Sequence, residues 1–131
     1  MAAGEVNSNI VGYVTKGLTA SQKIQSGAQF VEVGTNELNI SSIVLEGVTA
    51  NGGVLIQWWN GATYEQAAWS SQTGLGDVPP VIPPYTGWAA SGNASAKKTF
   101  APGEGFWIVA PSSGITAGAK VKIANQVLGV L

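Results

Sequence analysis

Short runs of alternating apolar and polar residues, separated by turn residues, recur along the whole chain. Such runs predict β-strands with one buried and one exposed face. The candidates are 9–15, 28–33, 54–59, 64–69, a short strand from Trp88, 97–100, 105–110 (expected to be buried) and 120–131, while 36–48 is ambiguous between a strand over 40–48 and a helical turn followed by a strand. A brief helical turn near 36–42 is also expected, and 16–27 is less regular. The pattern predicts an all-β fold: a single small antiparallel β-sandwich or barrel of about eight short strands, closed by contact between its first and last strands.

Residues 54–69 carry the strongest hairpin signal. Asn60 and Gly61 stand between two apolar-rich segments, and both residue types accept the positive φ that a type I′ turn requires. A loop of two or four residues pairs the same side chains, because the number of loop residues stays even. One face then carries Val54, Ile56, Trp58, Ala67 and Trp69, with Glu65 near the tip. The other face mixes aromatic and amide groups: Leu55, Gln57, Trp59, Tyr64, Gln66 and Ala68.

The whole chain, 1–131, is predicted to be one β-domain, with 1–8 as an N-terminal extension. Residues 71–87 are a long Pro/Gly-rich loop, because X-Pro pairs favour extended geometry and proline cannot donate to a β-ladder. We expect this loop to be packed by its own apolar side chains, Leu75, Val78, Val81, Ile82 and Tyr85. Lys120 and Lys122 alternate with apolar residues near the C-terminus, which predicts an edge strand guarded by charge.

Composition excludes several classes of function. Only 10% of residues are charged, against about 25% in ordinary soluble domains, and the net charge is −1. The absence of Arg and of any basic stripe argues against nucleic acid as a partner. No apolar run reaches the roughly 18 residues of a membrane span. A weakly charged surface suits either packing against copies of the same chain or a monomer with a neutral polar surface.

No catalytic or cofactor-binding constellation is visible, so the prediction is a non-enzyme without a cofactor or metal. The chain contains no His and no Cys, which removes the commonest general base and the commonest metal ligands. The acids are scattered, and nothing brings two of them together for glycoside hydrolysis. Gly103-Glu104-Gly105 lacks the third glycine and the helix of a dinucleotide fingerprint, and is better interpreted as a turn.

The aromatic residues are the positive signal. An exposed Trp or Tyr ring can stack on a sugar or anchor a protein interface, and neighbouring amides can bind hydroxyl groups. The candidate platform, for an interface or a glycan, comprises Gln57, Trp59, Tyr64 and Gln66, with Tyr85 and Trp88 as possible edges. Three interpretations stay open: the tryptophans fill the core, form an interface, or bind a carbohydrate.

Four segments, NIVGYV, IQWWNGATYE, APGEGFWI and VKIANQV, resemble a pattern close to NIVGY…W-[ND]-G-x-x-Y…PGEGF-[WF]. It occurs in small exported all-β domains of Planctomycetes–Verrucomicrobia-type bacteria, and the resemblance spans Asn9 to Val127. It implies export and a β-fold and brings no catalytic residues. Trp58 stands where that pattern has a smaller aliphatic residue, which suggests a surface particular to this chain.

The favoured function is a secreted, non-enzymatic structural protein that self-assembles into an extracellular filament, tube or coat. The alternative is a carbohydrate-binding module. The expected partners are copies of itself and, on the alternative, a polysaccharide. No signal peptide is visible, and we expect Met1 to be an added start on a mature exported protein. Strand addition to a neighbouring copy is predicted at two terminal segments, represented by Ile10, Val11, Tyr13, Val14, Val121, Ile123 and Val127.

Overall fold

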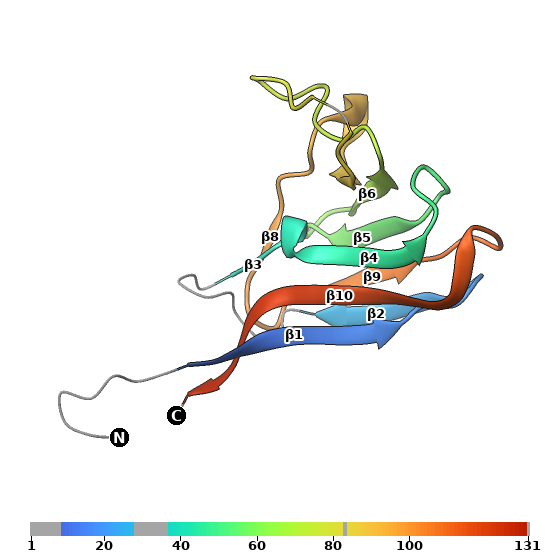
Figure 1. Ribbon diagram of the computed structural model, residues 1–131. Helices are drawn as coiled ribbons and strands as arrows, with labels where there is room; N and C mark the ends of the chain where they lie inside the picture. The colour runs from blue at the N-terminus through green and yellow to red at the C-terminus, as the bar shows by residue number, and fades with distance from the viewer. Residues whose placement is uncertain (1–8, 28–36, 83, 131) are drawn as a thin grey trace.

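The computed structural model describes residues 9–27, 37–82 and 84–130, and in these residues the chain is all-β (Figure 1). Every strand-to-strand pairing is antiparallel, which confirms the predicted fold class. The strands belong to two main sheets and one small two-stranded sheet. Figure 1 shows the two main sheets as two layers, one behind the other.

The first main sheet has three strands in the order β1-β10-β4: β1 (Asn9–Gly17), β10 (Ile115–Val130) and β4 (Ile43–Val48). The second has five strands in the order β2-β9-β5-β6-β7: β2 (Lys23–Gly27), β9 (Gly105–Val109), β5 (Leu55–Trp59), β6 (Tyr64–Ser70) and β7 (Gly87–Ala89). A short pair, β3 (Leu38–Asn39) with β8 (Thr99–Phe100), closes one end.

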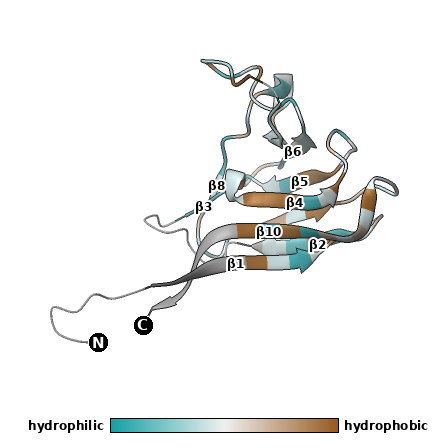
Figure 2. Ribbon diagram, in the orientation of Figure 1, coloured by the Kyte–Doolittle hydropathy of each residue, from teal (hydrophilic) through white to brown (hydrophobic). Residues whose placement is uncertain are grey.

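The core lies between the two main sheets, because both contribute inward-facing apolar side chains to one cluster. On the three-stranded sheet Leu45, Val121 and Ile123 are buried, and they alternate with exposed or half-buried residues (Figure 2). Ile56, Phe106 and Ile108 are fully buried on the five-stranded sheet. Period-two alternation therefore places each apolar set on the inner face of its sheet.

The β5–β6 hairpin has the register that parity predicts. Trp59 pairs with Tyr64 and Gln57 with Gln66, and the predicted core set from Val54 to Trp69 is buried. The predicted type I′ turn is wrong, because the connection has four residues and only Gly61 of the Asn60–Gly61 pair has a positive φ. The Asn60 side chain instead accepts hydrogen bonds from the amides of Ala62 and Thr63, at 2.9 and 2.8 Å.

Three local predictions are corrected. The segment expected to be irregular before Gly27 contains β2, which pairs with β9. The C-terminal strand is the centre of its sheet, not an edge, and begins at Ile115 within the segment expected to be a loop. Its two lysines pair with Glu46 on β4, at 3.8 Å for Lys120 and 3.9 Å for Lys122.

In the described part of the chain the helical elements are two short 3-10 turns, η1 (Ile40–Ser42) and η2 (Ser91–Asn93), instead of the single turn expected. The side chain of Asn39 caps η1 by accepting a hydrogen bond from the amide of Ser41. The predicted strand 28–33 and the extension 1–8 lie outside the described residues. Among the described residues, no helix is long and apolar enough to cross a membrane.

Candidate functional site

The outer surface of the five-stranded sheet carries a group of aromatic and amide side chains that we call the aromatic face. It comprises Gln57, Trp59, Tyr64, Gln66 and Trp107. Trp59 and Tyr64 are 50% and 56% exposed, and Trp107 is half-buried beside them. These side chains point away from the core because they alternate with Trp58, Phe106 and Ile108, which are buried.

The three rings of the aromatic face contact one another edge to face. The ring centroids of Trp59 and Tyr64 are 5.0 Å apart at an interplanar angle of 69°. Those of Tyr64 and Trp107 are 5.6 Å apart at 76°. This geometry is the favoured one for aromatic pairs, and it fixes the rings relative to one another. The rings therefore form a corrugated surface instead of a flat plate.

Polar groups border the rings on one side. Gln57 lies between Gln66 and Trp107 across the strands, and its amide donates a 3.2 Å hydrogen bond to the side-chain oxygen of Gln66. The ammonium of Lys23 stands 5.7 Å from the Trp107 ring centroid, within reach of a cation–π contact. The face thus combines exposed ring surface with amide groups and one positive charge.

The structure brings together four of the six residues predicted for the platform and separates the other two. Trp88 is 4% exposed, so the prediction that it forms an edge of an exposed platform is wrong. Its ring packs against Trp69 in the core at 5.1 Å. Tyr85 lies beside Gly87, at the far end of β6 from the aromatic face. Trp107 belongs to the face although its segment, 105–110, is apolar throughout and predicts a wholly buried strand.

The paired ends of β1 and β10 form a second feature, which we call the β1–β10 arm (residues 9–13 and 124–130). β4 pairs with β10 only as far as the Ile43–Ile123 pair, whereas β1 follows β10 to the Asn9–Val130 pair. The arm is therefore a two-stranded ribbon that extends past the beginning of β4 (Figure 1). Its seven β10 residues span about 23 Å.

The predicted strand-addition segments divide between the arm and the sheet. Val121 and Ile123 pair with β1 on one side and β4 on the other, so the prediction that they add to a neighbour's sheet is wrong. Ile10 and Val11 lie on β1, an outer strand, and Val127 lies in the part of β10 beyond β4. These positions have a main-chain edge with no strand partner in the described part of the chain.

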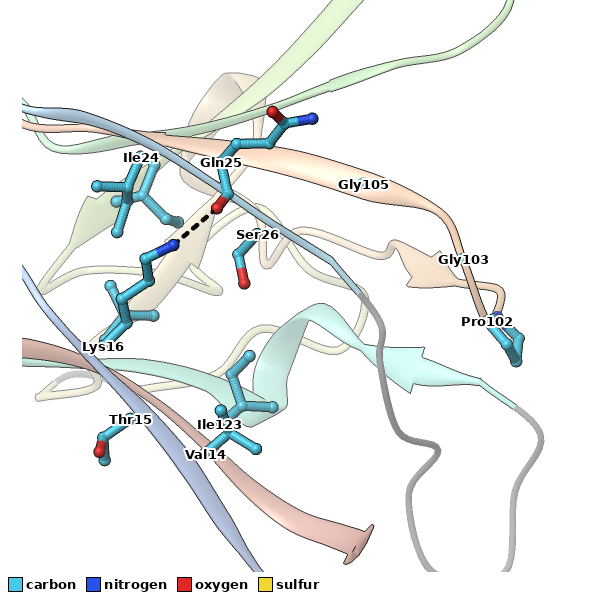
Figure 3. A pocket seen from close by; sticks show the side chains of 12 residues that line it. Val14, Thr15, Lys16, Ile24, Gln25, Ser26, Pro102, Gly103, Gly105 and Ile123 are labelled. Carbon is cyan, nitrogen blue, oxygen red and sulfur yellow. Dashed lines mark hydrogen bonds between the residues drawn. The ribbon is translucent and has the colours of Figure 1, made fainter.

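A cleft of about 760 Å³ opens between the two sheets on the β1–β2 side (Figure 3). Its floor is apolar, with Ile24, Val121 and Ile123 among its lining. The ammonium of Lys16 reaches from β1 across the opening and donates a 3.0 Å hydrogen bond to the main-chain oxygen of Gln25 on β2. Lys16 therefore covers a carbonyl group on an outer strand, a charged guard of the kind that protects sheet edges.

The Pro/Gly-rich loop between β6 and β7 (71–86) is the third exposed feature. The expectation that its apolar side chains pack against one another is wrong, because Val78 is 98% and Ile82 84% exposed. Leu75, Val81 and Tyr85 are also exposed to a lesser degree. Figure 2 shows apolar segments on this loop, which lies at the top of the view, away from the sandwich. A cleft of about 840 Å³ separates its base from β4.

The loop is held by hydrogen bonds at its base. The amide of Val81 donates to the main-chain oxygen of Gly74 at 2.9 Å, and the amide of Gly74 donates to that of Asn93 at 2.8 Å. The carboxylate of Asp77 accepts a 2.9 Å hydrogen bond from the amide of Ser95. The Ser95 hydroxyl, that amide and the charge of Lys97 together lower the pKa of Asp77 below its ordinary value, and outweigh the opposing effect of desolvation.

Two further acidic side chains, those of Glu104 and Glu65, have polar partners. Lys98 and Glu104 form an ion pair of 2.7 Å beside the small β3–β8 sheet. Glu65 accepts a 3.3 Å hydrogen bond from the indole of Trp58 at the hairpin tip. No three acidic residues gather into a potential metal site in the described ranges 9–27, 37–82 and 84–130.

Comparisons with protein-family models, curated proteins and solved structures found no match to this chain. The resemblance to exported bacterial β-domains therefore stays a prediction. The site must be interpreted from its own geometry: an aromatic face, a two-stranded arm and an apolar loop.

Proposed function

We propose that this protein is a secreted, non-enzymatic structural subunit that self-assembles through strand addition at its β1–β10 arm into an extracellular filament, tube or coat. The observation that supports the proposal most directly is the pairing of the arm, which has no third strand to cover it in the described part of the chain. An isolated two-stranded ribbon is marginally stable in water, and a further strand satisfies its unpaired amide and carbonyl groups. A neighbouring copy supplies such a strand.

The sequence of the arm supports the same proposal. Residues 9–13 and 124–130 contain no charged residue and no proline, and they include Ile10, Val11, Val127 and Leu128. Segments of this composition pair readily with other strands, whereas natural sheet edges are usually blocked by charge, proline or bulges. The β1–β10 pairing has register shifts between Ile10 and Val11 and between Gly12 and Val14, and pairing continues beyond them to Asn9 and Val130.

The opposite end of β1 supplies the contrast. There Lys16 binds the Gln25 carbonyl, and Lys120 and Lys122 pair with Glu46 within the sheet. One end of the three-stranded sheet is thus guarded by charge and the other is not. This polarity directs a neighbouring strand to the arm.

The test is electron microscopy and sedimentation velocity of the purified chain over rising concentration. Val11→Lys places a charge in the arm, and Thr15→Lys places the same charge on the guarded half of β1. We expect the wild type and Thr15→Lys to form polymers, and Val11→Lys to stay monomeric at the concentrations where the other two polymerise, with an unchanged near-UV spectrum. A wild type that sediments as a monomer at every concentration overturns the proposal, as does full assembly of Val11→Lys over the same concentrations as the wild type.

A second candidate function, carbohydrate binding, is favoured by the exposure of Trp59 and Tyr64 and by the amides beside them. Because the rings stand at 69° and 76° to one another, they offer stacking positions for one or two pyranose rings instead of a flat bed for a crystalline polysaccharide. Soluble oligosaccharides of equatorially substituted pyranoses are the matching ligand class.

Titration of soluble cello-oligosaccharides against the intrinsic Trp fluorescence tests this candidate. Trp59→Ala should weaken binding at least about tenfold, the value of one lost stacking contact. Ile82→Ala removes an exposed apolar side chain elsewhere and should leave the affinity unchanged. Equal affinities of wild type and Trp59→Ala would exclude the aromatic face as a sugar site.

A further inference from the structure

We infer that the apolar tip of the 71–86 loop of one copy docks on the aromatic face of the next copy, as a head-to-tail contact between subunits. This inference rests on the proposed self-assembly and adds a second contact to it, made by side chains instead of main-chain edges. The two surfaces are complementary in chemistry, and both are exposed in a single chain.

The loop presents its apolar groups on a fixed framework. Val78 and Ile82 are almost completely exposed, yet the loop base is held by the Val81–Gly74 and Gly74–Asn93 hydrogen bonds. Gly74 has a φ of +99°, and a Cβ added there would lie 2.7 Å from the Cβ of Val81, so the base is closely packed. Ordering such a loop before binding lowers the entropy lost on association.

The aromatic face has the properties that recognise proline-rich segments. Such segments carry carbonyl acceptors but few amide donors, and they bind to surfaces lined by Trp and Tyr rings that also offer N–H and O–H donors. Trp59, Tyr64 and Trp107 supply the rings, and Gln66 adds an exposed amide. Trp59 and Tyr64 are 50% and 56% exposed, and the indole N–H of the one and the hydroxyl of the other are hydrogen-bond donors for such carbonyl groups.

Charge does not oppose this contact. Residues 78–86 contain no charged side chain, and Lys23 is the cation beside Trp107. Burying an uncharged apolar loop against rings and amides therefore desolvates no unpaired charge of the loop.

The two surfaces lie at opposite ends of one strand. Tyr64 begins β6, where it pairs with Trp59 at the end of β5, and the loop leaves β6 from its other end at Ser70, about 20 Å away along the strand. The loop contacts Ser95, Asn93 and Gly92 at its own end of the sheet instead. A contact between two different patches on successive copies is heterologous, and it generates open chains unless the rotation closes into a ring.

Ring geometry favours the loop over a sugar as the occupant. Rings that meet at 69° and 76° present an uneven apolar surface, which suits branched side chains such as those of Val78 and Ile82 better than a flat chain of sugar rings. A polysaccharide chain stacks best on rings that share one plane, which these do not. Binding of an oligosaccharide at the face is the competing outcome.

A complementation experiment tests the inference. The loop variant Val78→Asp/Ile82→Asp keeps an intact face, and the face variant Trp59→Ala/Tyr64→Ala keeps an intact loop. Both carry Val11→Lys, so that the arm contact does not obscure the result. Because Val11→Lys alone keeps an intact loop and an intact face, it should form open chains through this side-chain contact only at protein concentrations above those at which the wild type polymerises, and the mixture is measured at those higher concentrations. Each variant alone should be monomeric, whereas their equimolar mixture should form a one-to-one dimer, because one intact loop then meets one intact face. Sedimentation velocity measures the masses.

All four substituted side chains are exposed, and thermal unfolding of each variant checks its fold. If a double variant unfolds, Ile82→Asp alone mixed with Trp59→Ala alone serves instead. Two separate monomers in the mixture overturn the inference, and so does an oligosaccharide that binds the face while no dimer forms. If the wild type polymerises, and the loop variant and the face variant without Val11→Lys still polymerise, the loop–face contact is excluded while the proposed self-assembly through the arm stands. If the wild type never assembles, both the proposed function and this contact are excluded.

Discussion

The indole N–H of Trp88 donates a 2.7 Å hydrogen bond to the main-chain oxygen of Ile43. Trp88 lies on β7 of the five-stranded sheet and Ile43 on β4 of the three-stranded sheet, so one side chain joins the outer strands of the two layers. Both residues are buried, where an unsatisfied carbonyl group is costly. The bond gives a physical reason for tryptophan at this buried position, because a smaller apolar side chain would have no N–H group to donate to the Ile43 oxygen.

Trp88→Phe should lower the free energy of unfolding by about 2–4 kcal/mol, because the Ile43 oxygen loses its donor and a small cavity forms. Urea unfolding followed by far-UV circular dichroism measures the change. Trp107→Phe on the outer face is the matched control and should cost less than about 1 kcal/mol. Equal effects of the two substitutions would contradict the role assigned to the bond.

Gly47 is required by both its conformation and its surroundings. Its φ is +73°, and a Cβ there would approach the Thr116 hydroxyl oxygen to 2.6 Å. We expect Gly47→Ala to destabilise the fold by about 2–5 kcal/mol, from left-handed strain plus the close contact. Gly118 has a φ of +82° with no atom near its Cβ position, so Gly118→Ala should show the strain alone, about 1–2 kcal/mol. Chemical denaturation of both variants separates the two causes, and a similar loss in each would exclude the Thr116 contact as a cause.

Asp77 should make the base of the 71–86 loop sensitive to acid. Its pKa is lowered in the folded chain, chiefly by the Ser95 hydroxyl, so its contribution to stability is present above the unfolded pKa of about 3.9. That contribution is lost as the pH falls through the lower folded value. The difference in unfolding midpoint between wild type and Asp77→Asn should therefore be constant near neutral pH and shrink below about pH 4. A difference that grows in acid would reverse the assigned direction of the shift.

The five tryptophans should divide into accessible and protected groups. Trp58, Trp69 and Trp88 are no more than 6% exposed, whereas Trp59 is half exposed. Trp59→Phe should remove the largest share of the fluorescence that acrylamide quenches, and Trp69→Phe should leave that share intact. Quenching of the wild type measured in dilute solution provides the reference. Protection of Trp59 in a monomer would contradict the described orientation of β5.

Parity along β5 and β6 is enough by itself to assign Trp58 and Trp59 to opposite faces of the hairpin. An even loop fixes which residues face each other whatever the turn type, so the wrong prediction for Asn60 does not affect the assigned faces. Alternation in the sequence does not assign Trp107 in this way, because its segment is apolar throughout; in the structure it faces outward between Phe106 and Ile108, which are buried. The pairing of β9 with β5 brings Trp107 into contact with Tyr64. This pairing joins segments far apart in the chain, so the local pattern of apolar and polar residues does not predict it.

The C-terminal strand shows a different limit of the sequence. Lys120 and Lys122 alternate with apolar residues as they would in an edge strand. They lie on β10, the central strand of its sheet, and both are within reach of Glu46 on the neighbouring strand β4. A carboxylate on a neighbouring strand allows lysine in a central strand. Here that carboxylate, on Glu46, is more than 70 positions away from both lysines in the chain, so the local sequence does not reveal the pairing. The exposure of Val78 and Ile82 is equally absent from the local pattern, because burial of loop residues depends on what the rest of the fold places beside them.

Sedimentation velocity of the wild type, Val11→Lys and Thr15→Lys at rising concentration, with electron micrographs of the same samples, tests the central claim most directly. The proposed function predicts polymers for the wild type and Thr15→Lys, and monomers for Val11→Lys at the concentrations where the other two polymerise. Monomers for all three proteins, or polymers for all three over the same concentrations, would contradict assembly through the β1–β10 arm.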